Sequence, residues 1–135
     1  MAPRRIRLCA DDYGIAPGVN AAIRDLIARR RLNATSVMVV APALDREAVD
    51  SLLQVAADAR AEIGLHLTLT APFAPLTGPF PPLRGGTFLP LGRTLLAALS
   101  RAFDPRNLSA EIDAQLDTFI ERFGRAPDFV DGHQH

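Results

Sequence analysis

Side chains that commonly bind metal ions gather at three points in this sequence of 135 residues. Each point lies in or directly after a short apolar run, and the residues concerned are Asp11, Asp12, His66, His133 and His135. Two histidines and one carboxylate can occupy one face of a divalent ion and leave its other positions for water and substrate. The pattern therefore predicts a hydrolytic metal centre, in which one aspartate of the pair binds the ion and its neighbour acts as a base on water.

Each of these clusters also has a purely structural interpretation. Adjacent aspartates at the end of a strand commonly form a turn or a helix cap. A histidine in an apolar strand is commonly hydrogen-bonded within a core, and a terminal His-x-His occurs in expression tags. The metal interpretation rests on all three clusters falling at one edge of a sheet, where the carboxyl ends of parallel strands meet.

The elements between the clusters are predicted from hydrophobic periodicity. Strands are expected at Ile6 to Ala10, Thr35 to Val40, Ile63 to Leu69 and from Phe129 onward. Helices are expected from Pro17 to Arg31, after Asp45, from Leu91 to Phe103 and from Ser109 to Phe123. Because strands alternate with helices, the sequence predicts an α/β fold: a parallel sheet of βα units with right-handed crossovers.

Residues 71–90 are rich in proline and glycine and predict a long loop. Phenylalanines at 73, 80 and 88 indicate that this loop is packed, because disordered segments are poor in aromatic residues. Loops of this length in compact domains are usually functional when they are not disordered.

Composition excludes several classes of protein. Fifteen basic residues balance fifteen acidic ones, so no net field attracts nucleic acid or an anionic membrane. The single cysteine, Cys9, excludes an internal disulfide and fits a reducing compartment. We see neither a signal peptide nor an apolar stretch of about 20 residues. We therefore expect a cytoplasmic protein with no membrane or nucleic-acid partner.

Several short motifs give the sequence a family resemblance. In chain order they are Ala10-Asp11-Asp12-Tyr13-Gly14, Asn20, Thr35-Ser36, Gly64-Leu65-His66-Leu67-Thr68, Phe123-Gly124-Arg125-Ala126-Pro127 and Asp131-Gly132-His133-Gln134-His135. In order and spacing they resemble the motifs of the YdjC-like carbohydrate deacetylases of the ChbG/HpnK type.

The resemblance implies a metal-dependent hydrolase that removes acetyl groups from N-acetylated sugars or oligosaccharides. It implies a fold related to the polysaccharide deacetylase (β/α) barrels, and magnesium or zinc as the ion. The metal ligands that it implies are Asp12, His66 and His133. It also makes Asp11 the general base and leaves His135 and Tyr13 as candidate substrate contacts.

Members of that family continue for about as many residues again. We therefore expect residues 1–135 to be a single partial domain, an incomplete (β/α) barrel without its C-terminal half, because four strands cannot close a barrel that usually needs eight. The missing half would supply the acid for the leaving amine. Open strand edges favour association, so we expect a homo-oligomer or aggregate with little activity.

Two other functions remain open at this point. The chain could be a non-catalytic metal-binding or sugar-binding fragment, or a half-barrel that docks on a partner. It could also be a metal phosphohydrolase, since phosphoester cleavage uses ions held by aspartate and histidine. A phosphohydrolase would usually need more carboxylates and often a second ion.

Overall fold

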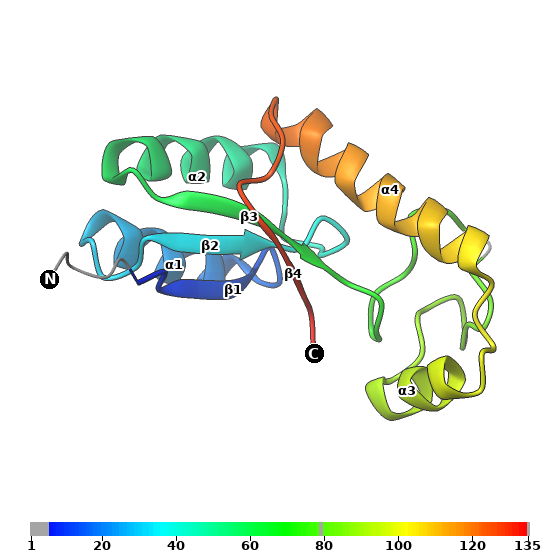
Figure 1. Cartoon of the computed structure of the whole chain (residues 1–135). Coiled ribbons are helices and arrows are strands. Elements are labelled where there is room, and N and C mark those ends of the chain that lie inside the picture. Colours follow the sequence, from blue (N-terminus) through cyan, green and yellow to red (C-terminus); the bar gives the residue numbers. More distant parts are fainter. Residues whose placement is uncertain (1–5, 79, 135) are drawn as a thin grey trace, which may run out of the picture.

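A computed structural model describes residues 6–78 and 80–134 of the chain. Strands and helices alternate along it (Figure 1). They are β1 (Cys9–Tyr13), α1 (Pro17–Ala28), β2 (Ala34–Val37), α2 (Arg46–Ala59), β3 (Glu62–Leu67), α3 (Leu91–Leu99), α4 (Pro105–Phe123) and β4 (Val130–Gly132). Within this described part, no helix combines the length and the apolar character needed to cross a bilayer.

The four strands form one sheet in the order β1-β2-β3-β4, and every neighbouring pair is parallel. Helices α1 and α2 connect the first three strands, as short βα units require. The predicted parallel α/β fold is therefore confirmed. Because all four strands run the same way, their carboxyl ends reach one edge of the sheet together.

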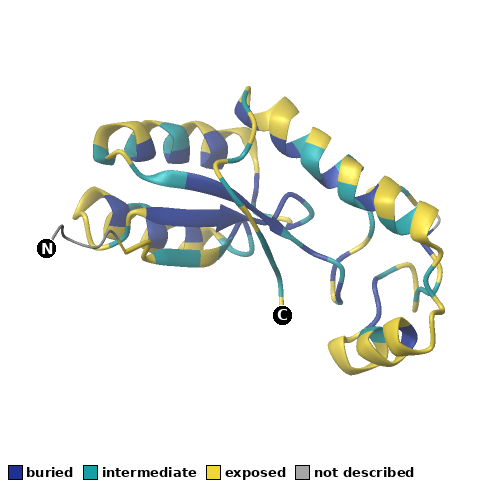
Figure 2. Ribbon diagram, in the orientation of Figure 1, coloured by how far each residue is buried: buried dark blue, intermediate teal, exposed yellow. Residues whose placement is uncertain are grey.

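The main apolar core lies between one face of this sheet and the helices. Side chains alternate along a strand, so Val37, Ile63 and Leu65 all point to this face. Ile27 and Leu52 meet them from α1 and α2, and both side chains are fully buried. In Figure 2 the buried residues follow β2 and β3 and the inner sides of α1, α2 and α4. This layer fixes the sheet that carries the candidate metal-binding side chains.

The other face of the sheet is strongly curved. β1 and β4 stand at opposite ends of the strand order, yet ligand atoms of Cys9, Asp11 and Asp131 all lie within 4.8 Å of one another. Beneath them the Phe129 ring covers Gly64, where a Cβ would lie only 2.4 Å from a ring carbon. Only glycine admits this ring. The curvature is that expected of a sheet curling toward a barrel.

β1 runs further than its apolar residues indicated. We expected it to end at Ala10, but it continues through both aspartates to Tyr13, with an irregular register between Ala10 and Tyr13. The irregularity is a bulge in which Asp12 has a φ of 64°. Aspartate tolerates this left-handed conformation better than most residues.

α4 begins earlier than Ser109, the expected first residue. Its first residue is Pro105, which suits a helix start because its missing N–H needs no partner there. Asp104 caps the helix by accepting a hydrogen bond from the Arg106 N–H at 2.8 Å. Leu108, in the first turn of α4, packs against the apolar cluster formed by Phe73, Phe80 and Phe88.

That loop is packed, as its aromatic residues predicted. Phe80 and Phe88 are buried and meet edge to face with centroids 5.3 Å apart. Phe73 joins them in a second apolar cluster that also contains Met38 and Ala41, from the connection after β2. The loop therefore has its own small core beside the carboxyl edge of the sheet.

Candidate metal centre

Asp12, His66 and His133 come together at the carboxyl edge of the sheet. Asp12 Oδ1 lies 3.3 Å from His66 Nε2 and 3.1 Å from His133 Nδ1, and the two ring nitrogens are 3.3 Å apart. Two atoms bound to one zinc or magnesium ion, each about 2.1 Å from it, stand roughly 3.0–3.4 Å apart in octahedral or tetrahedral geometry. The three atoms therefore have the spacing of one triangular face around a single ion.

The Asp12 carboxylate has an oxygen that nothing in the described protein satisfies. Its side chain is partly exposed, but Oδ1 itself is buried and lacks a hydrogen-bond partner. The two ring nitrogens are close to it, yet neither approach has hydrogen-bond geometry. A buried carboxylate oxygen without a partner is costly. A cation between the three atoms would remove that cost, so the residues fit a divalent metal ion.

The bulge in β1 explains how Asp12 reaches this edge. In a regular strand Asp12 would share the face of Ala10, which packs against the helix-side core. The left-handed residue interrupts the alternation, and Tyr13 enters the core instead. Asn20 then fixes the following turn: its Oδ1 accepts the Gly14 N–H at 2.6 Å, and its Nδ2 donates to the Ala43 carbonyl at 2.8 Å.

The His66 ring is held through Nδ1, on the side of the ring away from Nε2, which is its atom in the triangle. Its side chain is only 3% exposed, and Nδ1 lies 2.7 Å from Asp131 Oδ1. Asp131 is the residue paired with His66 across the β3–β4 ladder. Ser36 Oγ lies 3.2 Å from the same ring nitrogen and donates to Asp11 Oδ1 at 3.3 Å. The ring is therefore placed with Nε2 toward the candidate metal position.

His133 is positioned by backbone and by aromatic contacts. Its N–H donates to the Leu67 carbonyl at 2.9 Å, which continues the β3–β4 pairing past the end of the strands. Its ring stands edge-on to His66, with centroids 5.3 Å apart, and to Phe73, at 6.0 Å. The proline-rich loop thus contributes one wall beside this ligand.

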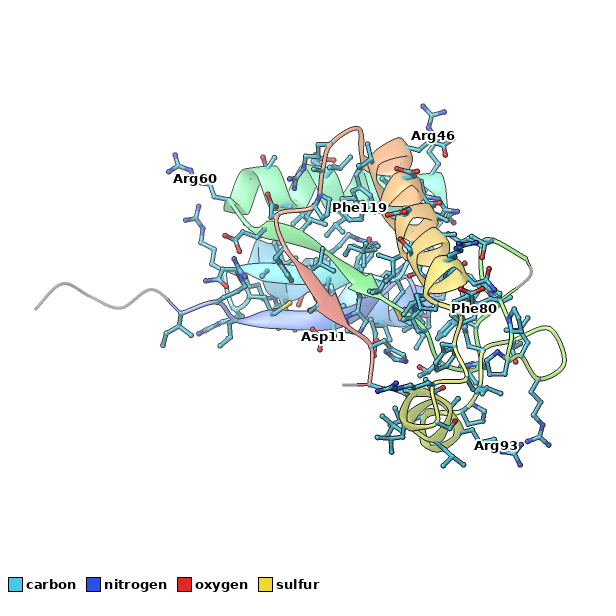
Figure 3. The ribbon with its side chains drawn as sticks, turned by 45° about the vertical axis from the view of Figure 1, so that its right-hand side comes forward. Asp11, Arg46, Arg60, Phe80, Arg93 and Phe119 are labelled. Atoms are coloured by element: carbon cyan, nitrogen blue, oxygen red, sulfur yellow. The ribbon has the colours of Figure 1, made fainter. Side chains whose placement is uncertain are left out.

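Asp11 lies on the curved face. The Ser36 hydroxyl links it to His66, because this hydroxyl donates to Asp11 Oδ1 and lies 3.2 Å from His66 Nδ1. Its side chain is exposed and projects beside the end of β1 (Figure 3). Burial, together with the negative charges of Asp11 and Asp131, raises the pKa of the nearby Cys9 thiol to about 11. Cys9 is therefore a protonated thiol at neutral pH and is not an active nucleophile.

The family model for YdjC-like proteins matches residues 5–135. This chain belongs to the YdjC-like family. Chitooligosaccharide deacetylases of Escherichia fergusonii and Citrobacter koseri are each 30% identical to it over 128 residues, which cover 93% of this chain and 47% of theirs. The chain thus spans about half the length of the curated relatives it matches.

The fold of this YdjC-like chain also occurs in a solved structure. A candidate cellobiose-phosphate cleavage protein from Enterococcus faecalis V583 superposes with a TM-score of 0.74 at 28% sequence identity. The match covers 94% of this chain and 47% of the other. The likeness therefore extends over nearly all of the YdjC-like chain and about half of its structural neighbour.

Tyr13 does not lie at the metal centre. Its ring is fully buried in the helix-side core of the YdjC-like chain, where its hydroxyl donates to the Ala48 carbonyl and accepts from Arg24, both at 2.7 Å. We correct the expectation that it contacts substrate: the bulge that carries Asp12 outward turns Tyr13 inward. His135, the other expected contact, falls outside the described residues.

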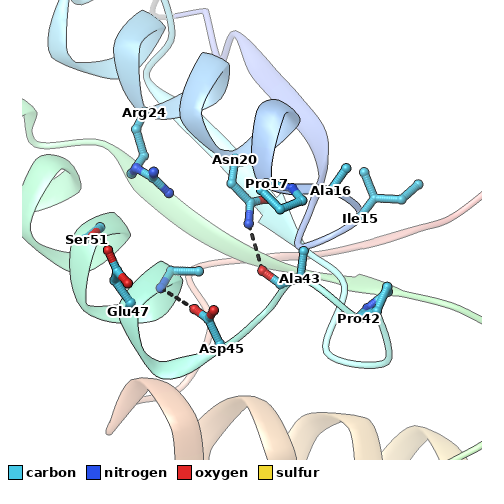
Figure 4. Close-up of a pocket in the computed structure, with 11 residues that line it drawn as sticks. Ile15, Ala16, Pro17, Asn20, Arg24, Pro42, Ala43, Asp45, Glu47 and Ser51 are labelled. Carbon is cyan, nitrogen blue, oxygen red and sulfur yellow. Dashed lines mark hydrogen bonds between the residues drawn. The ribbon is translucent and has the colours of Figure 1, made fainter.

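A hollow among the described residues of the YdjC-like chain is lined by none of Asp12, His66 and His133. It lies between the starts of α1 and α2, where Asn20, Arg24, Asp45 and Ser51 line it (Figure 4). The hydrogen bond from Asn20 Nδ2 to the Ala43 carbonyl joins two of the residues that line this hollow. The motif residue Asn20 thus connects the loop after β1 with the loop after β2.

Asp131 and Ser36 were not assigned a role from the sequence. Both lie in motifs, but nothing in a motif shows that they converge on His66 Nδ1. The information is in the strand register, which pairs His66 with Asp131 and Ser36 with Gly64. The register can be counted from the strand ends, and it would have indicated Asp131 and Ser36 if each predicted end had been correct to within one residue.

Proposed function

We propose that this chain carries the metal centre of a carbohydrate deacetylase, which removes acetyl groups from N-acetylated sugars. The observation that supports this most is the triangle of Asp12, His66 and His133, in which the Asp12 corner is a buried carboxylate oxygen without a hydrogen-bond partner among the described residues. The names of the two 30%-identical relatives support chitooligosaccharides as the class of substrate.

The donor set suits zinc or magnesium, with His66 bound through Nε2 and His133 through Nδ1. Two imidazole nitrogens favour zinc, because magnesium prefers oxygen ligands. Either ion, when bound, polarises the acetyl carbonyl and lowers the pKa of water. The protein's part is to hold both histidines neutral and the Asp12 carboxylate ionised.

Asp11 is the proposed general base. It takes a proton from the water whose oxygen attacks the acetyl carbon, and the carbon–nitrogen bond then breaks as a separate acid gives a proton to the departing nitrogen. The products are acetate and the free amine of the sugar. Ser36 supports this role because its hydroxyl donates to Asp11 Oδ1 and thereby orients the carboxylate.

Isothermal titration with zinc and with magnesium tests the metal centre. We expect one ion per chain, and a loss of binding in Asp12→Asn and in His66→Gln. Asp113→Asn on the exposed side of α4 is the matched control for charge, and it should bind normally. Failure of the unmodified chain to bind either ion would remove the basis of the proposed function.

Acetate release from N-acetylglucosamine oligomers tests the reaction. It should be measured with this chain alone and with the chain joined to the C-terminal half of the Escherichia fergusonii relative. Release that EDTA abolishes and a divalent ion restores supports the deacetylase. Metal binding with no acetate from either protein would favour the non-catalytic metal-binding fragment.

Phosphohydrolase activity should be assayed as well, by phosphate release, because the structural neighbour is named for cleavage of cellobiose phosphate. Among the described residues, the side-chain hydrogen-bond and ion-pair partners of His66 are Ser36, Asp131, Asp12 and His133. None is a lysine or arginine that would bind a phosphate. We therefore expect no phosphate release from phosphorylated cellobiose.

A further inference from the structure

We propose that Asp131 is a positioning residue, which keeps a proton on His66 Nδ1 and so leaves Nε2 available to a metal ion. This inference rests on the proposed metal centre and adds to it a residue that binds neither metal nor substrate. Its basis is the 2.7 Å contact between Asp131 Oδ1 and His66 Nδ1.

The direction of that hydrogen bond follows from chemistry. An ionised carboxylate can only accept, so the proton between the two atoms belongs to the imidazole. A neutral imidazole has one such proton, and Asp131 on the Nδ1 side competes for it with Asp12 and His133 on the Nε2 side. Asp131 accepts at 2.7 Å, whereas Asp12 Oδ1 lies 3.3 Å from Nε2 without hydrogen-bond geometry and His133 Nδ1, an uncharged acceptor, also lies 3.3 Å away. The proton therefore stays on Nδ1.

Both partners of this hydrogen bond, His66 and Asp131, are held in place by their surroundings. His66 is almost completely buried, so its ring has little freedom to turn. Asp131 lies between two backbone bonds, from Leu65 N–H to Phe129 and from His133 N–H to Leu67, both 2.9 Å long. The carboxylate is thus held where it faces Nδ1, as the outer partner of a metal-binding histidine commonly is.

Histidine tautomers can be measured directly in the metal-free protein. Long-range ¹H–¹⁵N spectra at about pH 9, where an ordinary imidazole is neutral, separate Nδ1–H from Nε2–H. The chain has three histidines, and His66→Gln identifies the signals of His66. We expect His66 to carry its proton on Nδ1. In Asp131→Ala we expect the proton to move to Nε2, whereas Asp131→Asn, whose amide oxygen still accepts, should keep it on Nδ1.

Zinc affinity supplies the second readout. Removal of an outer hydrogen-bond partner typically weakens metal binding 10–100-fold, so we expect that loss in Asp131→Ala and a smaller one in Asp131→Asn. The matched control is Asp128→Ala, which removes a carboxylate from the same segment, one that accepts from Ile63 N–H and pairs with Arg125. It should change affinity less than about 3-fold.

The outcomes separate this inference from the proposed function. If the unmodified chain binds no metal, the metal centre itself is wrong. If the chain binds zinc and Asp131→Ala changes neither tautomer nor affinity, Asp131 has no positioning role. A loss of affinity without a change of tautomer, or an equal loss in Asp128→Ala, would also overturn the proposal, because both indicate general loosening of β4.

Discussion

The left-handed backbone at Asp12 determines where three consecutive side chains go. Asp11 points to the curved face, Asp12 to the edge of the sheet and Tyr13 to the core. A regular strand would have placed Asp11 opposite to both of its neighbours. Backbone strain of this kind is concentrated at functional sites, where the rest of the structure compensates for it. The two aspartates thereby obtain different surroundings and can have different roles.

Those roles predict opposite effects of the same substitution. Asp11→Asn should leave zinc affinity nearly unchanged and reduce acetate release by about 10²–10⁴-fold, the usual contribution of a positioned base. Asp12→Asn should weaken metal binding, because the orphaned oxygen belongs to this side chain. Isothermal titration with zinc and acetate-release assays on both variants measure these two effects. Loss of metal in Asp11→Asn with retention in Asp12→Asn would show that the roles are exchanged.

Cys9 offers a chemical test of the curved face. With a pKa of about 11 the thiol is protonated at pH 8, and its reaction with iodoacetamide should be slow and should rise with pH up to about 11. Asp11→Asn and Asp131→Asn each remove a negative charge that raises this pKa. Both variants should therefore react faster than the unmodified chain at a fixed alkaline pH. In Asp25→Asn, on α1, Cys9 should react at the rate of the unmodified chain. A rate that levels off below pH 9 would contradict the predicted surroundings.

At the scale of elements, α4 fixes the proline-rich loop to the sheet. Glu111 is fully buried and accepts from the N–H groups of Leu76 and Thr77 and from the Thr77 hydroxyl. Gln115, one turn later, bonds both the N–H and the carbonyl of Thr68, just beyond the end of β3. One helix face thus holds the loop and the strand that carries His66.

Glu111→Gln tests this connection. The new amide would place an N–H₂ group against backbone donors, and one of them would lose its acceptor. We expect the free energy of unfolding to fall by about 1–3 kcal/mol. Trypsin should also cleave faster after Arg84, within the loop. Glu121→Gln, at an exposed position on the same helix, controls for the loss of charge and should change neither measurement.

Sequence patterns predicted the elements better than their ends. Apolar periodicity located every strand and helix, because the core imposes that periodicity on the residues that build it. It could not locate the bulge, since charged Asp11 and Asp12 lie inside a strand whose apolar pattern stops at Ala10. The role of Asp131 was equally hidden, because its contact with His66 joins residues 65 positions apart.

At the scale of the molecule, β1 and β4 each pair on one side only within the described residues. Apolar side chains stand exposed there, with Leu8 52% and Val130 57% accessible, and α3 exposes Leu95, Leu96 and Leu99. An unpaired edge is a template for another strand. We therefore predict that the 135-residue chain self-associates in solution.

Val130→Lys examines the contribution of the β4 edge. A charge on an edge strand opposes pairing with another chain, so the variant should show a lower apparent mass by light scattering at the same concentration. Val19→Lys, on the exposed side of α1, controls for the added charge. Equal masses for the unmodified chain and both variants would show that the edge does not drive association.

The proposed ligands come from β1, from β3 and from the residue directly after β4, and His133 lies 67 positions from His66. A chain emerging from the ribosome can pair β1, β2 and β3 while the centre still lacks both His133 and Asp131. Closing so long a loop costs entropy that only the later contacts repay. Capture of the proposed ion would therefore follow the pairing of β1, β2 and β3, and metal uptake would report the moment at which β4 joins them.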